Sequence, residues 1–338
     1  MNRLATVVTA FALLMVPAAD AIATTFKIAT ITPDGTQWMT RMRAAGDDIK
    51  QRTQGRVQFK FYPGGVMGND DAMLRKIRAG QLHGGMLSVG GLDLIYQNAS
   101  ILSLPLLFDS YAEVDYVRAR IDPLIQQGLE KNGFVSFGLA DGGFALLFAS
   151  APVRGIDDVR GRKVWVPPND PISKSVFDTV GLAPVTLPLA DVMTGLQTGM
   201  IDTVAVSPVG AIALQWYTRL KYVTDTPLLY LYGALVLEQR AFNKLTAADQ
   251  AVVREVLTDV FKEFDRKNRA DDADARAALK REGIEFVAVS PENQARWEAA
   301  ARGARERLAK SGVFTPSVFE VLQGNLTEYR QKAKTGAR

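Results

Sequence analysis

The sequence predicts an α/β fold of two similarly built lobes, joined at a hinge, with a ligand cleft between the lobes and long C-terminal helices. Three observations predict it: two stretches of chain that read alike, a strand–helix–strand pattern near residue 26, and a change to long amphipathic helices after residue 246. In open α/β sheets ligands bind beyond the carboxyl ends of strands. Two such units that face each other therefore line a cleft from both sides.

The two similar stretches are residues 77–91 and 196–210. In each, an amphipathic helix ends at a glycine (Gly80, Gly199), and a short apolar run typical of a buried strand follows. Ser88 and Ser207 fall where these strands end. Three of the fifteen positions are identical. An alternative therefore stays open, in which both stretches are ordinary helix-to-strand turns of a single domain.

The order of the elements supports the two-lobed reading. Residues 26–30 and 57–61 alternate as strands do, and the helix between them places Trp38, Met42 and Ile49 on one face, which predicts a βαβ unit. The double proline after Val166 ends a strand that contains Trp165. We expect short strands to cross between the lobes, and the helical tail to pack across the back of both.

The expected boundaries follow from this order. Residues 1–23 read as a signal peptide, residues 24–143 with about 232–275 as lobe I, residues 144–231 as lobe II, and residues 276–338 as C-terminal helices that pack on the lobes. The first segment has a basic start, some sixteen apolar residues and the cleavage site Ala21-Ile-Ala23. That run is shorter than the roughly 20 residues of a spanning helix, so export is favoured over a membrane anchor.

Composition narrows the class of protein. The chain has 338 residues, 47% hydrophobic and 22% charged, which is ordinary for a globular protein. It has no cysteine, which rules out disulfides, thiolate nucleophiles and Cys-ligated metals. The net charge is +4 and the basic residues are dispersed, so nucleic acid is not an expected partner. The oligomeric state is not fixed by the sequence, and a monomer is the expectation.

The sequence offers little catalytic equipment. Its single histidine, His83, lies at the start of a predicted strand and is expected to be structural. No phosphate loop and no nucleophile elbow are present. The acidic pairs at 47–48, 157–158 and 271–272 are expected on exposed faces. We therefore predict no catalytic residues, no metal and no cofactor, and favour binding over turnover, with an exported enzyme on the same scaffold as the alternative.

Several motifs, in order, carry a resemblance to a known family. They are Gly55-Arg-Val with Tyr62-Pro-Gly-Gly and Met67-Gly, Leu104-Pro-Leu-Leu-Phe108, the run from Asp157 to Pro167, Leu196-Gln-Thr-Gly-Met-Ile-Asp202, and Lys244-Leu-Thr-Ala-Ala-Asp-Gln250. Over about residues 26–250 the chain resembles the dicarboxylate-binding (DctP-type) substrate-binding subunits of tripartite ATP-independent periplasmic (TRAP) transporters. The resemblance implies a periplasmic binding protein fold that closes on its ligand. It also implies small and large membrane subunits as partners that receive the solute.

Departures from the family pattern bear on the ligand. Where the family has an arginine for the ligand carboxylate, this chain has Trp165, and where a second arginine often follows Gly-Phe, it has Ala145. A bidentate guanidinium is the strongest carboxylate contact a protein offers. We therefore expect an aromatic or weakly polar solute. A small organic acid held without the usual arginine stays open, as does a core role for Trp165.

The expected ligand contacts come from position in the chain, and each can also be read as packing or turn chemistry. They are Gln37, Ser88, Phe144, Trp165, Asn169, Ser207, Trp216 and Tyr230. The expected function is capture of a small organic solute and delivery to the TRAP membrane subunits, and a sensory ligand-binding subunit is a further alternative.

Overall fold

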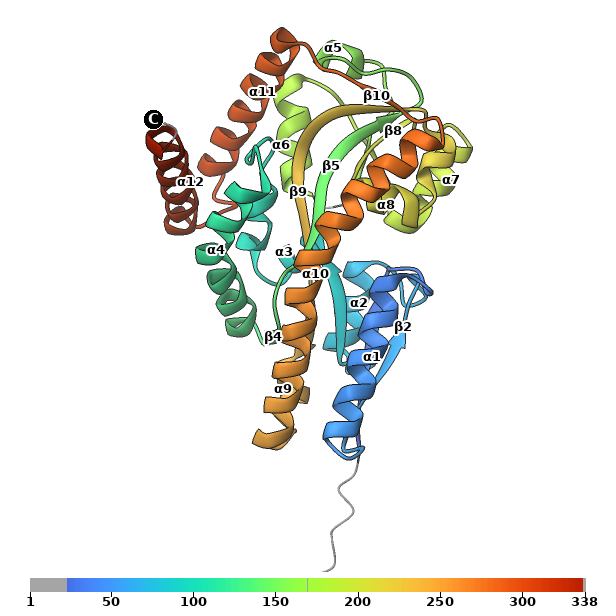
Figure 1. Ribbon diagram of the computed structural model, residues 1–338, viewed down its shortest axis with the longest axis vertical. Coiled ribbons are helices and arrows are strands. Elements are labelled where there is room, and N and C mark those ends of the chain that lie inside the picture. Colours follow the sequence, from blue (N-terminus) through green and yellow to red (C-terminus); the bar gives the residue numbers. More distant parts are fainter. Residues whose placement is uncertain (1–22, 169, 337–338) are drawn as a thin grey trace, which may run out of the picture.

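The computed structural model describes residues 23–168 and 170–336, and the two-lobed α/β fold predicted from the sequence is confirmed (Figure 1). The expected signal peptide falls, up to residue 22, outside the described residues. The strands are β1 (Thr24–Thr30), β2 (Val57–Tyr62), β3 (Gly84–Ser88), β4 (Phe134–Ser136), β5 (Ala140–Ala149), β6 (Trp165–Val166), β7 (Val185–Thr186), β8 (Thr203–Val206), β9 (Tyr222–Glu238) and β10 (Glu285–Val287).

The helices follow the strands in the predicted alternation. They are α1 (Gln37–Arg52), α2 (Asp70–Arg78), α3 (Val89–Asp93), α4 (Tyr111–Lys131), α5 (Ile156–Val159), α6 (Pro171–Val180), α7 (Val192–Gln197), α8 (Pro208–Ala213), α9 (Gln239–Phe242), α10 (Ala247–Arg281), α11 (Pro291–Lys310) and α12 (Pro316–Gly336). Short 3₁₀ helices are η1 (Gln97–Ser103), η2 (Leu189–Asp191) and η3 (Trp216–Arg219). Across the described residues, the helices lack the length and apolar character needed to cross a membrane.

The predicted βαβ unit is present, because β1 pairs in parallel with both β2 and β3. Both predicted glycine helix ends are also confirmed. Gly80 and Gly199 have φ values of 71° and 68°, the left-handed conformation that closes a helix without the steric cost of a Cβ atom. The two stretches that read alike therefore do form two similar helix-to-strand steps.

One sheet runs through both lobes in the order β2-β1-β3-β9-β5-β8, and β6 and β7 form a separate pair. The expectation of short crossing strands is wrong. The lobes are joined by β5, with 10 residues, and β9, with 17 residues, which run side by side through the molecule (Figure 1). Two long strands bonded to each other satisfy most of their backbone groups across the crossing, which separate short connections cannot do.

The ladder between the crossing strands is interrupted at one place. Ala145 pairs with Leu229 but Leu147 pairs with Thr224, so residues 225–228 of β9 have no partners in β5. Such an irregularity bends a strand and increases its local twist. It lies between the end of the sheet that carries β3 and the end that carries β8.

The apolar core is divided between the two faces of the sheet. In the first lobe, one cluster includes Met42 of α1 and Leu257 of α10, and the opposite cluster includes Leu74 of α2 and Val117 of α4. In the second lobe, Leu146 and Leu147 of β5 point to opposite sides and join different clusters. This alternation follows directly from the two-residue period of a strand.

The helical tail packs across both lobes, as predicted. α10 contacts α1 in the first lobe and α8 in the second, α11 packs on α6, and α12 packs on α4. Arg330 of α12 donates from Nε to the buried Glu113 carboxylate of α4 at 2.7 Å, which ties the C-terminal helix to the first lobe. The expected lobe boundaries near residues 144, 232 and 276 fall inside β5, β9 and α10, because these elements are shared by the two lobes.

Candidate functional site

The carboxyl ends of two strands face each other across the crossing pair. β3 and β5 are antiparallel to β9, and β8 is antiparallel to β5, so β3 and β8 run toward each other. Ser88 ends β3 opposite Gly233, while Val206 of β8 lies opposite Leu146, next to the level of Leu229. These levels are four residue steps apart along β9, a span of about 13 Å. The similar stretches at residues 77–91 and 196–210 therefore contain two strands whose carboxyl ends face each other.

Ser88 is exposed and linked to Asp70, the first residue of α2. The Ser88 Oγ donates a hydrogen bond to Oδ2 of Asp70, and the Ser88 backbone N–H donates to the same oxygen at 3.2 Å. Burial of the Asp70 carboxyl raises its pKa, although these hydrogen bonds act in the opposite direction. Gly91 allows this approach, because a Cβ atom there would lie 2.7 Å from Asp70.

Ser207 stands at the other strand end as the N-cap of α8. Its Oγ accepts a hydrogen bond from the Gly210 backbone N–H at 3.3 Å, and the residue is 5% exposed. Phe144 and Tyr230 lie between the two strand ends as paired residues of β5 and β9, with ring centroids 5.7 Å apart. Phe144 is half-buried, whereas Tyr230 is fully buried and its hydroxyl accepts from Arg118 at 3.0 Å. The position of Tyr230 is that of a core residue.

Trp165 and Trp216 are both buried in the second lobe and contact each other, with ring centroids 5.5 Å apart at 77°. The Trp165 indole N–H donates to the Leu187 carbonyl at 2.8 Å. Arg162, which could be thought to replace the family arginine, donates instead to the Asp158 carbonyl at 3.3 Å. Gln37 is the exposed first residue of α1, and Asn169 lies outside the described residues.

A pocket of about 520 Å³, lined by both charged and apolar residues, lies between α3 and the second lobe. Asp93 lines it from α3, and the other lining residues are Val166, Pro167, Asp170, Pro171, Lys174, Phe177, Asp178, Pro184 and Thr186. We call this the cleft pocket. Sequence reasoning missed Asp93 and Asp170. Asp170 followed by Pro171 is a recognisable helix start, but a sequence alone does not show which helix start faces the opposite lobe.

The charges of the cleft pocket are mostly negative. Burial, together with the nearby charge of Asp170, raises the pKa of Asp93 to about 6, and the Asp93 carboxylate accepts from Ser100 Oγ at 2.8 Å. Asp170 caps α6 by accepting from the Ile172 and Ser173 backbone N–H groups. Lys174 is the cation that the described lining offers, and it pairs with Asp178 at 2.6 Å. This arrangement disfavours a ligand with two negative charges.

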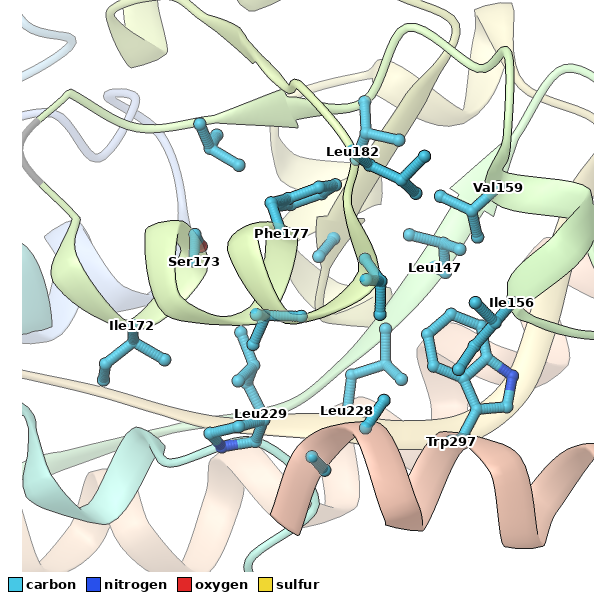
Figure 2. A pocket seen from close by; sticks show the side chains of 18 of the residues that line it. Leu147, Ile156, Val159, Ile172, Ser173, Phe177, Leu182, Leu228, Leu229 and Trp297 are labelled. Atoms are coloured by element: carbon cyan, nitrogen blue, oxygen red, sulfur yellow. The ribbon is translucent and has the colours of Figure 1, made fainter. Parts of the chain in front are cut away.

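A second, apolar cavity of about 100 Å³ lies between α6, α11 and the crossing strands (Figure 2). Leu147 of β5, Leu228 and Leu229 of β9, Phe177 of α6 and Trp297 of α11 surround it. Trp165 also lines it. Trp165 therefore forms part of a hydrocarbon wall, and its indole N–H is already bonded to the protein.

Two further expectations concern polar residues. His83 is structural, as expected: its Nδ1 accepts from the Lys27 backbone N–H at 3.0 Å. The expectation that Asp272 is exposed is wrong, because α10 lies against β5 and α8 and leaves the residue 8% exposed. Burial raises its pKa to about 6. Within residues 23–168 and 170–336, no three His, Cys, Asp or Glu side chains are grouped to hold a metal ion.

The profile of the family described as DctP, bacterial extracellular solute-binding protein, family 7, matches residues 28–311 of the chain. The chain belongs to this family. A solute-binding protein of Roseobacter denitrificans is 25% identical to this family 7 protein over 305 residues, which cover 88% of this chain and 90% of the relative.

Solved structures show the same fold. This family 7 protein is similar to DctPAm of Advenella mimigardefordensis, a sugar acid binding protein in complex with galactonate, with a TM-score of 0.84, 17% identity, and coverage of 91% of this chain and 99% of that one. It is also similar to a TRAP periplasmic solute binding protein from Desulfovibrio salexigens with bound orotic acid, with a TM-score of 0.81, 17% identity, and coverage of 90% and 99%.

Proposed function

We propose that this family 7 protein is the periplasmic receptor of a TRAP transporter, which captures a small organic solute between its lobes and delivers it to the small and large membrane subunits. The observation that carries the proposal is the pair of facing strand ends, Ser88 and Ser207, on either side of two shared strands. Ligands of open α/β sheets bind at such carboxyl ends. The signal peptide read in residues 1–23 supports export.

The lobes of this receptor are residues 24–143 with about 232–275, and residues 144–231. Closure bends β5 and β9, and residues 225–228 of β9, which have no partners in β5, supply a place for the bend. A solute that contacts both lobes binds the closed form more tightly, and this difference in affinity drives closure.

The ligand contacts are proposed at the facing ends and on the crossing strands, through Ser88, Ser207 and Phe144, with Gln37 and Asn169 at the margins. Trp165 in place of the family arginine favours a solute that is less polar than the sugar acid and orotic acid named for the structural neighbours. The acidic side chains of the cleft pocket support this preference, because a dianion there meets Asp93 and Asp170 without an unpaired lysine in the described lining.

The test begins with mass spectrometry of the solute that copurifies with the protein, followed by calorimetric titration of that compound. A receptor binds the solute and returns it chemically unchanged, whereas an exported enzyme on this scaffold converts it. Deletion of the gene should abolish uptake of the same compound by intact cells. Normal uptake after deletion, with loss of a transcriptional response to the solute, would instead favour the sensory alternative.

A further inference from the structure

We infer that the solute carries an apolar group of ring size, which binds in the cavity between α6 and α11, while its head group stays in the cleft pocket. The inference rests on the proposed receptor function and specifies the chemical class of the solute. It places the solute in the cavity and the cleft pocket, which Ser88, Ser207 and Phe144 do not line. It also excludes solutes with two negative charges.

The first observation is that the cavity adjoins the cleft pocket. Val166 and Phe177 line both spaces, so they form the partition between them. Figure 2 shows Ile172 and Ser173 at one end of the lining, near the start of α6, and Ile156 and Trp297 at the other end. Because Asp170 and Pro171 line the cleft pocket and directly precede Ile172, the first end is the one that meets the cleft.

The second observation is the chemistry of the lining. Apart from Ser173 and two tryptophans, the side chains that line the cavity are hydrocarbon. The Ser173 hydroxyl already donates a hydrogen bond to the Asp170 carboxylate at 2.5 Å. The Trp165 indole N–H already donates to the Leu187 carbonyl. The polar groups of a sugar acid would lose their bound water in this cavity and gain no hydrogen bonds in return, which costs free energy. An apolar group gains from the same transfer. At about 100 Å³ the cavity is smaller than the roughly 150 Å³ cavity that accepts benzene in an engineered protein, so a ring enters with a small outward movement of the lining side chains.

A third observation concerns Trp297. Its indole N–H is buried and has no acceptor among the described residues. Because the Trp297 ring lines the cavity, its indole N–H can report whether the cavity is occupied.

The cavity also touches the segments that join the lobes. Leu106, Leu228 and Leu229 line it, and the Leu106 backbone N–H donates to the Leu228 carbonyl at 2.8 Å. Leu106 has a φ of 44°, a left-handed conformation that is unfavourable for leucine. An apolar group bound against Leu228 therefore contacts the interrupted part of β9, where closure bends the strand.

The experiment compares three probes by isothermal calorimetry: phenylacetate, 2-phenylethanol and succinate. We expect both ring-bearing probes to bind at least tenfold more tightly than succinate. Ala301→Leu adds three carbon atoms to the cavity wall from α11, and we expect it to weaken the ring-bearing probes at least tenfold. The matched control is Ala299→Leu, which adds the same atoms to an exposed position of α11 and should leave binding within twofold of wild type.

A second measurement uses the wild-type protein, so it does not depend on whether Ala301→Leu folds. Phenylacetate should shift the indole N–H resonance of Trp297, assigned with Trp297→Phe. Succinate that binds as tightly as phenylacetate, ring-bearing probes that do not bind, or an unmoved Trp297 resonance would each overturn the inference. A sugar acid that copurifies and is transported would overturn it and leave the receptor function standing. If the purified protein converts the solute chemically, the proposed receptor function would itself be contradicted.

Discussion

Trp165 and Trp216 pack edge to face in the second lobe, and the Trp165 indole N–H donates to the Leu187 carbonyl. The substitution of the family arginine by Trp165 thus changes the interior of a lobe as well as its polarity. The described residues that line the cavity beside Trp165 include no carboxylate, so a guanidinium directed into that cavity would have no charged partner there. The tryptophan instead contributes to the core and to the cavity at the same time.

Replacing Trp165 separates these two contributions. Trp165→Ala should lower the free energy of unfolding by about 3–5 kcal/mol, the range for deleting a large buried aromatic side chain. Trp165→Phe keeps much of the contact with Trp216 but loses the hydrogen bond to Leu187, and about 1 kcal/mol with it. Urea unfolding measures both values, and equal losses in the two variants would contradict this packing role.

The same residue has a predicted effect on binding. Trp165→Ala should reduce the change in tryptophan fluorescence on addition of the copurified solute, with the remaining response coming from Trp297, and should weaken binding at least tenfold. The affinity is measured by calorimetry at a temperature where the variant is folded. An unchanged affinity would remove Trp165 from the binding site and leave only its role in the core.

Gly91 and Gly90 form a matched pair beside Ser88. A Cβ atom at Gly91 would lie 2.7 Å from Asp70, whereas at Gly90 the nearest atom is the Ser88 Oγ at 3.9 Å. Gly91→Ala should therefore destabilise the protein by about 1–3 kcal/mol, because the contact between Asp70 and Ser88 must open. Gly90→Ala should have little effect. Denaturant unfolding of the two variants decides the point, and similar midpoints would argue against a tight contact.

The raised pKa of Asp93 predicts that the stability of the protein depends on pH. Its pKa is raised from an ordinary 3.8 to about 6, so between these values the folded protein holds a proton that the unfolded chain has released. The free energy of unfolding therefore falls as the pH rises from about 4 to 6. Asp93→Asn can still accept from Ser100 but does not ionise. It should match wild type near pH 4 and exceed it at pH 7 by roughly 1–2 kcal/mol, after allowance for solvent screening.

The control for Asp93 is Asp47→Asn, on the exposed face of α1. It removes one carboxylate from an exposed helix and serves as the reference for the Asp93 variant. Thermal melts at pH 4 and pH 7 provide the measurement. If Asp93→Asn differs from wild type by the same amount at both pH values, the Asp93 carboxyl is not the source of the pH dependence.

Ser207 allows a test that separates helix capping from ligand contact. Ser207→Ala removes the acceptor for the Gly210 N–H and should cost about 1 kcal/mol of stability. Ser207→Asn retains an acceptor and should recover most of that stability. If the hydroxyl also contacts the solute, both variants bind more weakly. Normal binding by Ser207→Asn would assign the residue to capping alone.

Local signals in the chain determined much of this fold. Gly80 and Gly199 marked the helix ends because few other residues adopt a positive φ there, and the alternation in residues 57–61 marked a strand because side chains alternate between its faces. Ser88 and Ser207 were placed at strand ends by the same local reasoning. The length of β9 was not predicted, because its bend and its prolonged pairing with β5 depend on contacts with a distant strand.

By itself, the sequence determined the two-lobed α/β class, the helix and strand order and the likeness of the two facing steps, because these depend on periodicity and on single residues with restricted backbone conformations. Only the tertiary structure decided which polar and apolar groups share a space. Asp93 meets Asp170 across the cleft pocket, Asp272 is buried, and Trp165 lines a cavity with Trp297, 132 positions away in the chain. Burial and the pKa values it shifts depend on neighbours brought together from distant segments, which no local pattern records.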